Sequence, residues 1–313
     1  MRVAFAHHLA LEYSGGGERW IAEVSRELVH RGHEVEIFCL PIIMKGSFNS
    51  LPDIGDTPYH VGYFHHITGF DVAYVTYHPL SWLSFRITSP KIAGIHSHCY
   101  WQPINRKYGL LPNLANFVHS LVGESELKRF DSIHTITNLY PMKSFFTHYI
   151  PNFVDSSIFY PRNNREHEFT VGFASRQVWQ KGYDVWEQIK AALPDVNFIE
   201  TGNLCAEEVP VFLSRCHVVV VPTRVDTFGL TIVESAMCGA LVISSGLPTH
   251  ECLGLPLMYA RKFSDYIHWI TKLKQIHEVG WPDTSYMRKQ ALEYDKQAII
   301  DRIEEMLVEV ATR

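Results

Sequence analysis

The 313-residue sequence predicts an α/β protein with two domains, each built on a doubly wound parallel sheet. Three observations support this prediction. The chain is about twice as long as a typical domain of about 150 residues. Short apolar runs alternate along it with segments of helical periodicity. The alternation also begins again after a proline-punctuated connection near the middle of the chain.

The opening of the chain has the pattern of a βαβ unit. Residues 2–6 form an apolar run typical of a strand, and a loop with three consecutive glycines follows it. Residues 18–30 carry apolar side chains at helical spacing, and residues 34–40 are again apolar. A strand, a helix and a second strand in this order favour a parallel sheet. Further strands of the first domain are expected at residues 72–76, 92–96 and 132–137.

A domain boundary is expected at residue 150, where Pro151 begins an irregular connection that continues to Pro161. Four apolar runs follow, separated by helical patterns, so the second domain repeats the architecture of the first. These strand candidates are residues 170–174, 197–200, 218–221 and 241–244. We expect the second domain to cover 151–285 and a terminal helix to cover 286–313, returning toward the first domain.

Composition and charge restrict the classes of partner. The net charge of −5 provides no basic surplus for nucleic acid. Six scattered cysteines without a C-x2-C pair fit a reducing compartment. No run of about 18 apolar residues is present, so we expect a cytoplasmic protein without a spanning segment, and contact with a membrane surface remains open.

The strongest motif follows the apolar run 218–221, where a proline-led loop enters a helix near Gly229. A helix amino terminus offers free N–H groups and the positive end of the helix dipole, which suits a phosphate. Asp226 and Glu234 are eight residues apart across this turn, so both carboxylates can reach ligand hydroxyls at the helix start. The alternative is that Asp226 caps the helix and Glu234 is a solvated helix position.

Two further motifs lie in loops that follow strands. Arg176 and Lys181 are five residues apart before Gly182, and two fixed cations can offset the charge of a diphosphate. Solvated surface side chains are the alternative. Near the amino terminus, Gly16 and Gly17 lack side chains, so their backbone can approach a phosphate or a sugar. The G-x-G-x-x-G pattern of dinucleotide-binding oxidoreductases is missing, which argues against that class.

Together these motifs resemble the retaining GT-B glycosyltransferases of family 4, the glycosyl transferases group 1. The resemblance implies two Rossmann-like domains facing a central cleft, with the acceptor bound by 1–150 and the nucleotide-sugar donor by 151–285. It implies that Asp226 contacts the hydroxyls of the donor sugar and that Glu234 binds the ribose. The residues implied to meet the diphosphate or the reacting sugar are Gly16, Gly17, His96, Arg176, Lys181, Phe228, Gly229, Leu230 and Thr231.

The resemblance also implies the reaction, which is transfer of a hexose from a UDP- or GDP-linked sugar to a glycan, lipid or small-molecule acceptor. No cofactor or divalent metal is expected, since the family generally needs none and no Asp-x-Asp ends a strand. Asp226 replaces the usual glutamate and Thr227 a usual glycine, which leaves the donor sugar undetermined. A binding protein without catalysis and an epimerase or hydrolase of the same fold remain alternatives.

Histidines and aromatic residues of the first domain allow two further interpretations. The pairs at residues 7–8 and 65–66 could bind a metal, although surface or core histidines are favoured because no carboxylate or cysteine completes a ligand spacing. A shelf for the acceptor could be formed by Tyr77, Trp82, Tyr100 and Trp101.

Overall fold

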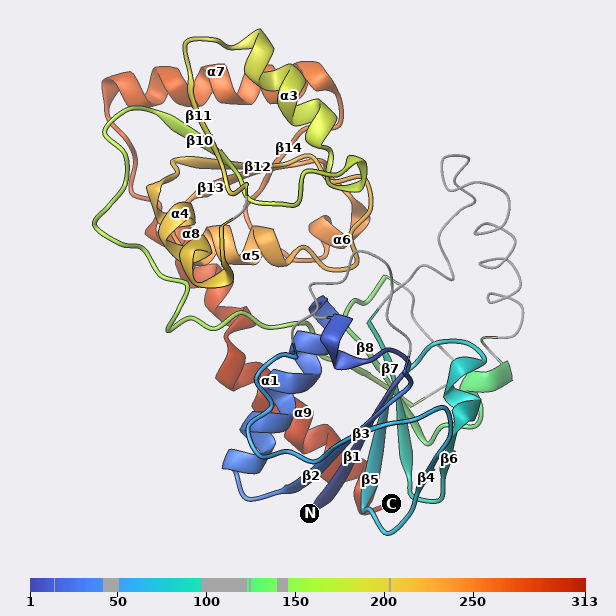
Figure 1. Cartoon of the computed structure of the whole chain (residues 1–313). Coiled ribbons are helices and arrows are strands. Elements are labelled where there is room, and N and C mark those ends of the chain that lie inside the picture. Colours follow the sequence, from blue (N-terminus) through green and yellow to red (C-terminus); the bar gives the residue numbers. More distant parts are fainter. Residues whose placement is uncertain (14, 42–50, 97–122, 124, 140–145, 203) are drawn as a thin grey trace. The chain divides into compact units, whose positions relative to one another are not determined.

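The computed structural model describes the chain except for residues 14, 42–50, 97–122, 124, 140–145 and 203. It divides into two compact units (Figure 1). Unit 1 consists of Met1–Ile150 together with Ile300–Arg313, and unit 2 consists of Pro151–Ile299.

Unit 1 is built on a seven-stranded parallel sheet with the strand order β3-β2-β1-β5-β7-β8-β9. Its strands are β1 (Arg2–His7), β2 (Glu34–Cys39), β3 (Tyr59–Val61), β5 (Val72–Thr76), β7 (Lys91–Ile95), β8 (Ser132–Thr135) and β9 (Thr147–Tyr149). Two short strands, β4 (His65–Ile67) and β6 (Phe85–Ile87), form a separate parallel pair. The described helical segments include η1 (Leu11–Tyr13), α1 (Gly16–His30) and η2 (Ser81–Ser84), the first and third being 3-10 helices.

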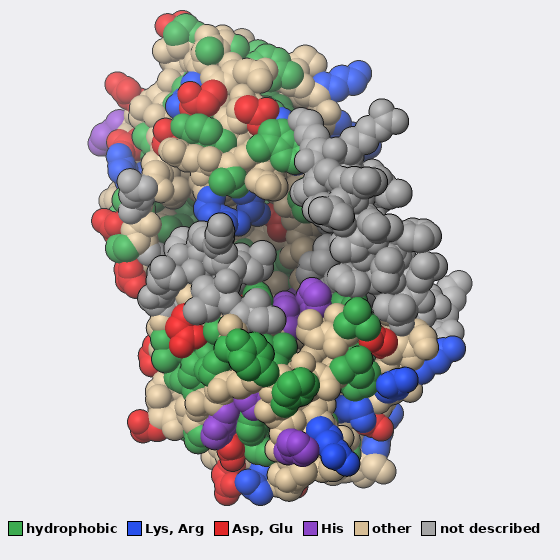
Figure 2. Space-filling model, turned by 45° about the vertical axis from the view of Figure 1, so that its right-hand side comes forward, with side chains coloured by type: hydrophobic (Ala, Val, Ile, Leu, Met, Phe, Trp, Pro, Cys, Tyr) green, Lys and Arg blue, Asp and Glu red, His purple; other side chains and the backbone are tan. Residues whose placement is uncertain are grey.

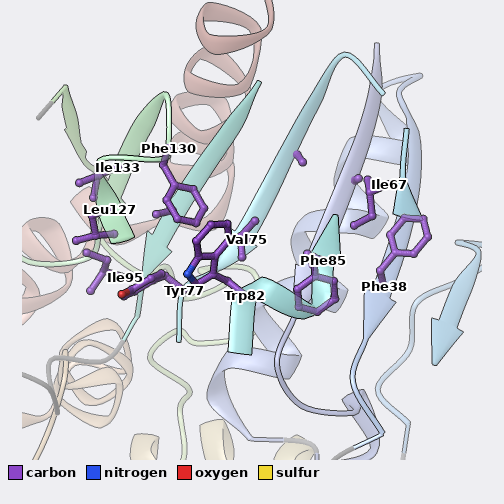
Figure 3. Close-up of a cluster of buried hydrophobic side chains, with 14 of the residues drawn as sticks. Phe38, Ile67, Val75, Tyr77, Trp82, Phe85, Ile95, Leu127, Phe130 and Ile133 are labelled. Carbon is purple, nitrogen blue, oxygen red and sulfur yellow. The ribbon is translucent and has the colours of Figure 1, made fainter. Parts of the chain in front are cut away.

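The central strands of unit 1 are buried on both faces, as expected for a parallel sheet covered on both sides. On one face, α1 buries Ile21, Val24 and Leu28. On the other, Trp82 and Phe85 join a cluster of aliphatic and aromatic side chains from β2, β5, β7 and β8 (Figure 3). This core holds the carboxyl ends of the strands in place.

Unit 2 has a five-stranded parallel sheet with the order β11-β10-β12-β13-β14. Its strands are β10 (Thr170–Phe173), β11 (Asn197–Glu200), β12 (Val218–Val221), β13 (Leu241–Ser244) and β14 (Met258–Tyr259). Its helices are η5 (Trp179–Lys181), α3 (Tyr183–Ala192), η6 (Ala206–Glu208), α4 (Val209–Arg215), α5 (Leu230–Met237), α6 (Pro248–Glu251), α7 (Phe263–Val279), α8 (Ser285–Ala291) and η7 (Leu292–Tyr294). Figure 1 shows α3 and α7 on one face of the sheet and α4, α5 and α8 on the other.

The terminal segment differs from the single helix expected over 286–313. After α8 and η7, the backbone of Asp295 is extended, and α9 (Lys296–Ala311) starts anew. The break is fixed within unit 2, because Val154 donates its backbone N–H to the carbonyl of Tyr294 and Ser156 donates to the Asp295 carboxylate. From Ile300 onward α9 belongs to unit 1. Within the described residues, no helix is both long and apolar enough to cross a membrane.

A buried histidine links three strands of unit 1. His134 Nε2 donates to the carbonyl oxygen of Ile150 at 2.8 Å, so the neutral ring accepts at Nδ1, where the Tyr74 hydroxyl donates at 2.5 Å. Burial is the largest influence on His134, and with the nearby charges of His148 and Arg302 it lowers the pKa of the ring to about 4, although the bond to Ile150 opposes the shift.

We therefore predict that unit 1 loses stability as the pH falls from 6.5 to about 4. In this window the unfolded chain protonates the His134 ring while the folded chain does not, so folding becomes less favourable by about 3 kcal/mol across the full range. The measurement is the free energy of unfolding by denaturant at a series of pH values. His134→Gln, whose amide can keep both hydrogen bonds, should reduce this slope by about one proton, and an unchanged slope contradicts the prediction.

Candidate active site

The donor residues expected in the second domain lie at the carboxyl ends of β10 and β12, which are neighbours in the sheet. Lys181 is the last residue of η5, and Asp226 lies in the loop after β12. Lys181 Nζ donates to Asp226 Oδ2 at 3.1 Å, and both side chains are mostly buried. Ligands of open α/β sheets bind at this edge, so the pair occupies the expected place for a site.

Gly182 brings the two loops into contact. Its φ of +75° lies in the left-handed region, and a Cβ atom added to it would lie 2.1 Å from the carbonyl oxygen of Pro222. Only glycine satisfies both conditions without a shift of the backbone. The glycine of the Lys-Gly pair thus has a physical role, because it permits the approach that places Lys181 beside Asp226.

Arg224 holds the same two loops together, and the sequence analysis did not identify it. Its guanidinium makes two hydrogen bonds with the Asp184 carboxylate, at 2.6 and 2.8 Å, and lies over the ring of Trp179. It also donates to the Trp179 carbonyl oxygen. A bidentate pair of this kind fixes geometry as well as charge. The only indication of this role in the sequence was that Arg224 lies two residues before Asp226.

Three groups surround the Asp226 carboxylate. Its Oδ1 accepts the backbone N–H of Phe228 at 3.4 Å, Lys181 occupies Oδ2, and His250 Nε2 lies 3.7 Å from Oδ2. Burial raises the pKa of Asp226, but His250 and Lys181 together outweigh it and hold the pKa well below its usual range. Asp226 is therefore a fixed negative charge at neutral pH.

The orientation of His250 follows from its other neighbour. The ring is fully buried, and its Nδ1 lies 2.7 Å from Ser244 Oγ. That oxygen accepts the backbone N–H of Gly246, which leaves the hydroxyl proton free to be donated to Nδ1. When Ser244 donates to Nδ1, the ring proton lies on Nε2, the nitrogen that faces Asp226. His250 thus supports the carboxylate from within the protein.

The start of α5 has the features expected of a phosphate site. Gly229 has a φ of +105° and precedes the helix, and its position is closely packed against His250. Among the described residues, no acceptor meets the backbone N–H groups of Gly229, Leu230 and Thr231. Three unbonded N–H groups and the positive end of the helix dipole favour an anion here.

The other residues expected in unit 2 have mixed surroundings. The Phe228 side chain is buried against Tyr294, so only its backbone is available to a ligand. Glu234 is on the second turn of α5 and is half-buried. Arg176 is exposed in the loop after β10, and its guanidinium has no polar partner in the described part of the chain.

The glycines expected in unit 1 form the start of α1. A Cβ at Gly16 would meet nothing within 4 Å, and one at Gly17 would meet only His7, at 3.8 Å. Next to these glycines in the sequence is Glu18, whose Oε1 lies 2.7 Å from His7 Nε2, and both side chains are buried. This pair joins the end of β1 to the first turn of α1. The sequence analysis did not identify Glu18 as a residue that fixes the glycine loop.

His96, which follows β7, lies within the histidine network of unit 1. Its Nε2 is 2.8 Å from the Tyr74 hydroxyl oxygen, and its ring is packed against Trp20. Because that hydroxyl donates its proton to His134, His96 Nε2 is the donor in this bond. His96 is therefore held in one orientation at the carboxyl edge of the sheet.

Two interpretations of unit 1 need correction or have limits. The acceptor shelf is wrong for Tyr77 and Trp82, which are buried in the core cluster (Figure 3). Tyr100 and Trp101, the other two members, lie outside the described residues. In the part of the chain that the structure describes, no three potential ligands gather around a metal position.

Comparison with known protein families shows which family part of this chain is similar to. Residues 169–258 match the family model of the glycosyl transferases group 1. This part of the chain is similar to the group 1 glycosyl transferases. The match contains the β10 loop with Arg176 and Lys181 and the whole segment from Asp226 to Glu234. No curated protein sequence matches the chain at a significant level.

Solved structures show that the whole chain has the GT-B fold of glycosyltransferases. Sucrose-phosphate synthase from Thermosynechococcus elongatus has a TM-score of 0.75 at 15% identity, over 99% of each chain. The Anabaena protein HepE, solved with UDP and glucose, has a TM-score of 0.69 at 15% identity, over 98% of this chain and 99% of its own. A glycosyltransferase from Rickettsia africae has a TM-score of 0.69 at 12% identity, over 99% and 98%.

The packing of Gly182 leads to a stability prediction. Gly182→Ala should lower the free energy of unfolding by about 2–5 kcal/mol, since it combines a left-handed residue with a clash against backbone. Gly254→Ala is the matched control, because Gly254 also has a positive φ but an added Cβ would meet nothing within 4 Å. The control should lose only about 1–2 kcal/mol. Equal losses in chemical denaturation show that the Pro222 contact is unimportant.

Proposed function

We propose that the protein is a retaining glycosyltransferase that transfers a hexose from a UDP- or GDP-linked sugar to an acceptor hydroxyl. The observation that carries this proposal is the juxtaposition in unit 2 of Lys181, Asp226 and the unbonded N–H groups at the start of α5. The group 1 family match over the same residues supports it.

The charges of this cluster suit a nucleoside diphosphate sugar. The diphosphate would accept hydrogen bonds from the N–H groups of α5. The positive charges of Lys181 and Arg176 would stabilise it as the leaving group when the glycosidic bond breaks. Glu234, one helical turn further along α5, would accept hydrogen bonds from ribose hydroxyls. The cations and the helix supply the required positive charge from the chain itself.

Retention of configuration requires the acceptor to attack on the face from which the diphosphate leaves. In this proposal the departing phosphate takes the proton of the acceptor hydroxyl, so catalysis consists of positioning and of stabilising the leaving group. His96, held by Tyr74, is the residue of unit 1 that we propose for the donor sugar, with Gly16 and Gly17 meeting the diphosphate through their backbone.

One observation favours a second candidate, a nucleotide-sugar-binding protein without transfer activity. Asp226, which is expected to hold the hydroxyls of the sugar, already accepts hydrogen bonds from Lys181 and from the N–H of Phe228. A thermal-shift screen of nucleoside diphosphates and their sugars tests binding, since a ligand at 100 times its Kd stabilises by about 2.7 kcal/mol. Turnover with the donors that bind then separates the two functions, and product analysis separates transfer from epimerisation or hydrolysis.

The two cations should dominate turnover. We expect Arg176→Ala and Lys181→Ala each to lower turnover by ~10²-fold or more, because each removes a fixed charge at the leaving diphosphate. Lys289→Ala, an exposed lysine of α8, is the control and should leave turnover unchanged. Steady-state kinetics with the donor found in the screen provides the measurement. Wild-type turnover in both loop variants would contradict the proposal that Arg176 and Lys181 contact the diphosphate.

Asp226 should affect binding and turnover in opposite directions. Asp226→Asn removes the negative charge that neutralises Lys181, so the affinity for free nucleoside diphosphate should rise by about 2- to 10-fold. Turnover of the sugar donor should fall by ~10²-fold, because the carboxylate that positions the sugar is lost. Calorimetry and kinetics measure the two effects. Asp184→Asn, which disturbs only the Arg224 pair, should not raise the affinity, and a rise in both variants contradicts the assignment.

A further inference from the structure

Four large apolar side chains that are not among the residues of the candidate active site are exposed on unit 1. They are Tyr63, Phe64, Leu80 and Leu83, with 73%, 80%, 52% and 53% of their surface exposed. We refer to these four residues as the apolar tip. On the face that Figure 2 shows, unit 1 carries exposed hydrophobic side chains together with side chains of Lys, Arg, Asp and Glu.

Strand register brings the two halves of the apolar tip together. Tyr63 and Phe64 directly precede β4, and Leu83 lies in η2 directly before β6. The strands are parallel, with His65 paired to Phe85. The residues before each strand therefore emerge at the same end of the β4–β6 pair, which places Tyr63 and Phe64 near Leu83.

The backbone at Leu80 is held in a rare conformation. Among the described residues it is the only non-glycine with a positive φ, at +64°, and Ser81 N–H donates to the Pro79 carbonyl oxygen at 2.7 Å across it. This is a γ-turn of the strained type. The buried carboxylate of Glu126 accepts the Leu80 N–H and thereby stabilises the turn. Such strain persists where the surrounding structure enforces it, and here the result is an exposed leucine.

Positive charge borders the apolar tip. Arg86 on β6 is exposed, and the Arg129 guanidinium lies 5.9 Å from the ring of Trp82 in η2. Neither residues 59–67 nor residues 79–90, the two segments that carry the tip, contain an aspartate or a glutamate. The two segments thus carry protruding apolar groups bordered by cations, and the Glu126 carboxylate that contacts them at Leu80 is buried.

We propose that the apolar tip docks onto a lipid bilayer that contains anionic headgroups. Aromatic and aliphatic side chains transfer from water into the boundary between headgroups and acyl chains, and neighbouring cations are attracted to the anionic surface. Four side chains on two loops are too few for a specific protein interface, which involves about 20–30 residues a side. The tip also lies at the carboxyl edge of the unit 1 sheet, since Ser81 Oγ is 3.1 Å from His78 Nδ1 just past β5.

Sedimentation with lipid vesicles tests this proposal on the full chain and needs no donor or acceptor, so its outcome is independent of the proposed transferase activity. The wild-type protein should bind vesicles of phosphatidylcholine with phosphatidylglycerol more strongly than vesicles of phosphatidylcholine alone, and added salt should weaken the difference. The double variant Tyr63→Ser with Phe64→Ser should lower the partition coefficient by about 10-fold or more.

Two further variants separate the apolar contribution to vesicle binding from the ionic contribution. Leu83→Ser should weaken binding to both kinds of vesicle, and Arg86→Gln should weaken binding by about 5-fold on the anionic vesicles only. Val279→Ser is the control, because Val279 is 93% exposed but lies in unit 2. It should bind as the wild type does. All five substituted positions are exposed, so the melting temperatures should match that of the wild type.

Three results would overturn the proposal. The first is a wild-type protein that binds neither kind of vesicle. The second is a double variant that binds as tightly as the Val279→Ser control. The third is a wild-type dimer in sedimentation velocity that becomes monomeric in the double variant while vesicle binding is absent, since the apolar tip would then join two copies of the chain.

Discussion

The contact between Gly182 and the carbonyl oxygen of Pro222 is the constraint on which the candidate donor site depends. It allows the loop after β10 to lie against the loop after β12, and no side chain fits between them. Lys181 precedes this contact and Asp226 follows it, so their ion pair is a consequence of backbone packing. Arg224 and Asp184 then close the same junction from the other side of the loop. Forming the Lys181–Asp226 ion pair therefore costs little additional conformational entropy, because the packing of the two loops has already fixed the backbone.

The polar groups of this junction form a chain of contacts. Ser244 is hydrogen-bonded to His250, His250 faces Asp226, and Asp226 neutralises Lys181. A diphosphate that approached Lys181 would compete with Asp226 for the ammonium group and would leave the carboxylate free for other donors, such as sugar hydroxyls. We therefore expect the two residues, which pair with each other here, to serve different parts of one ligand. We propose this exchange as the way in which a buried charge pair becomes a binding site.

The fold and the site were predictable to different extents. Apolar runs predicted β1, β2, β5, β7 and β8 of unit 1 and the four longer strands of unit 2, and most of these strands have a strong signal because they are buried on both faces; β11 is half-buried. The three-residue strands β3, β4, β6 and β9 have mostly half-exposed or exposed side chains and no such signal. Arg224 and Glu18 were missed for a related reason. Their roles depend on partners that only the folded chain brings near, such as Asp184 from α3 and His7 from the end of β1.

The break between α8 and α9 illustrates the same limit. Helical spacing is continuous enough over 286–313 to predict one helix, yet tertiary bonds from Val154 and Ser156 fix an extended residue at Asp295. Local periodicity reports which face of a segment is apolar, and it does not report a hydrogen bond made by a residue more than a hundred positions away.

The aspartate at position 226, where the resembled family usually has glutamate, has a specific structural consequence. An aspartate oxygen can accept the N–H two residues further on, which closes a small ring that mimics a backbone turn. Asp226 Oδ1 does so with Phe228, and the turn leads directly into Gly229 and the start of α5. A glutamate has one methylene more and would reach past this N–H. The shorter acid therefore shapes the loop that presents the N–H groups of α5, and any contact it makes with a ligand is made by a carboxylate already oriented by its own backbone.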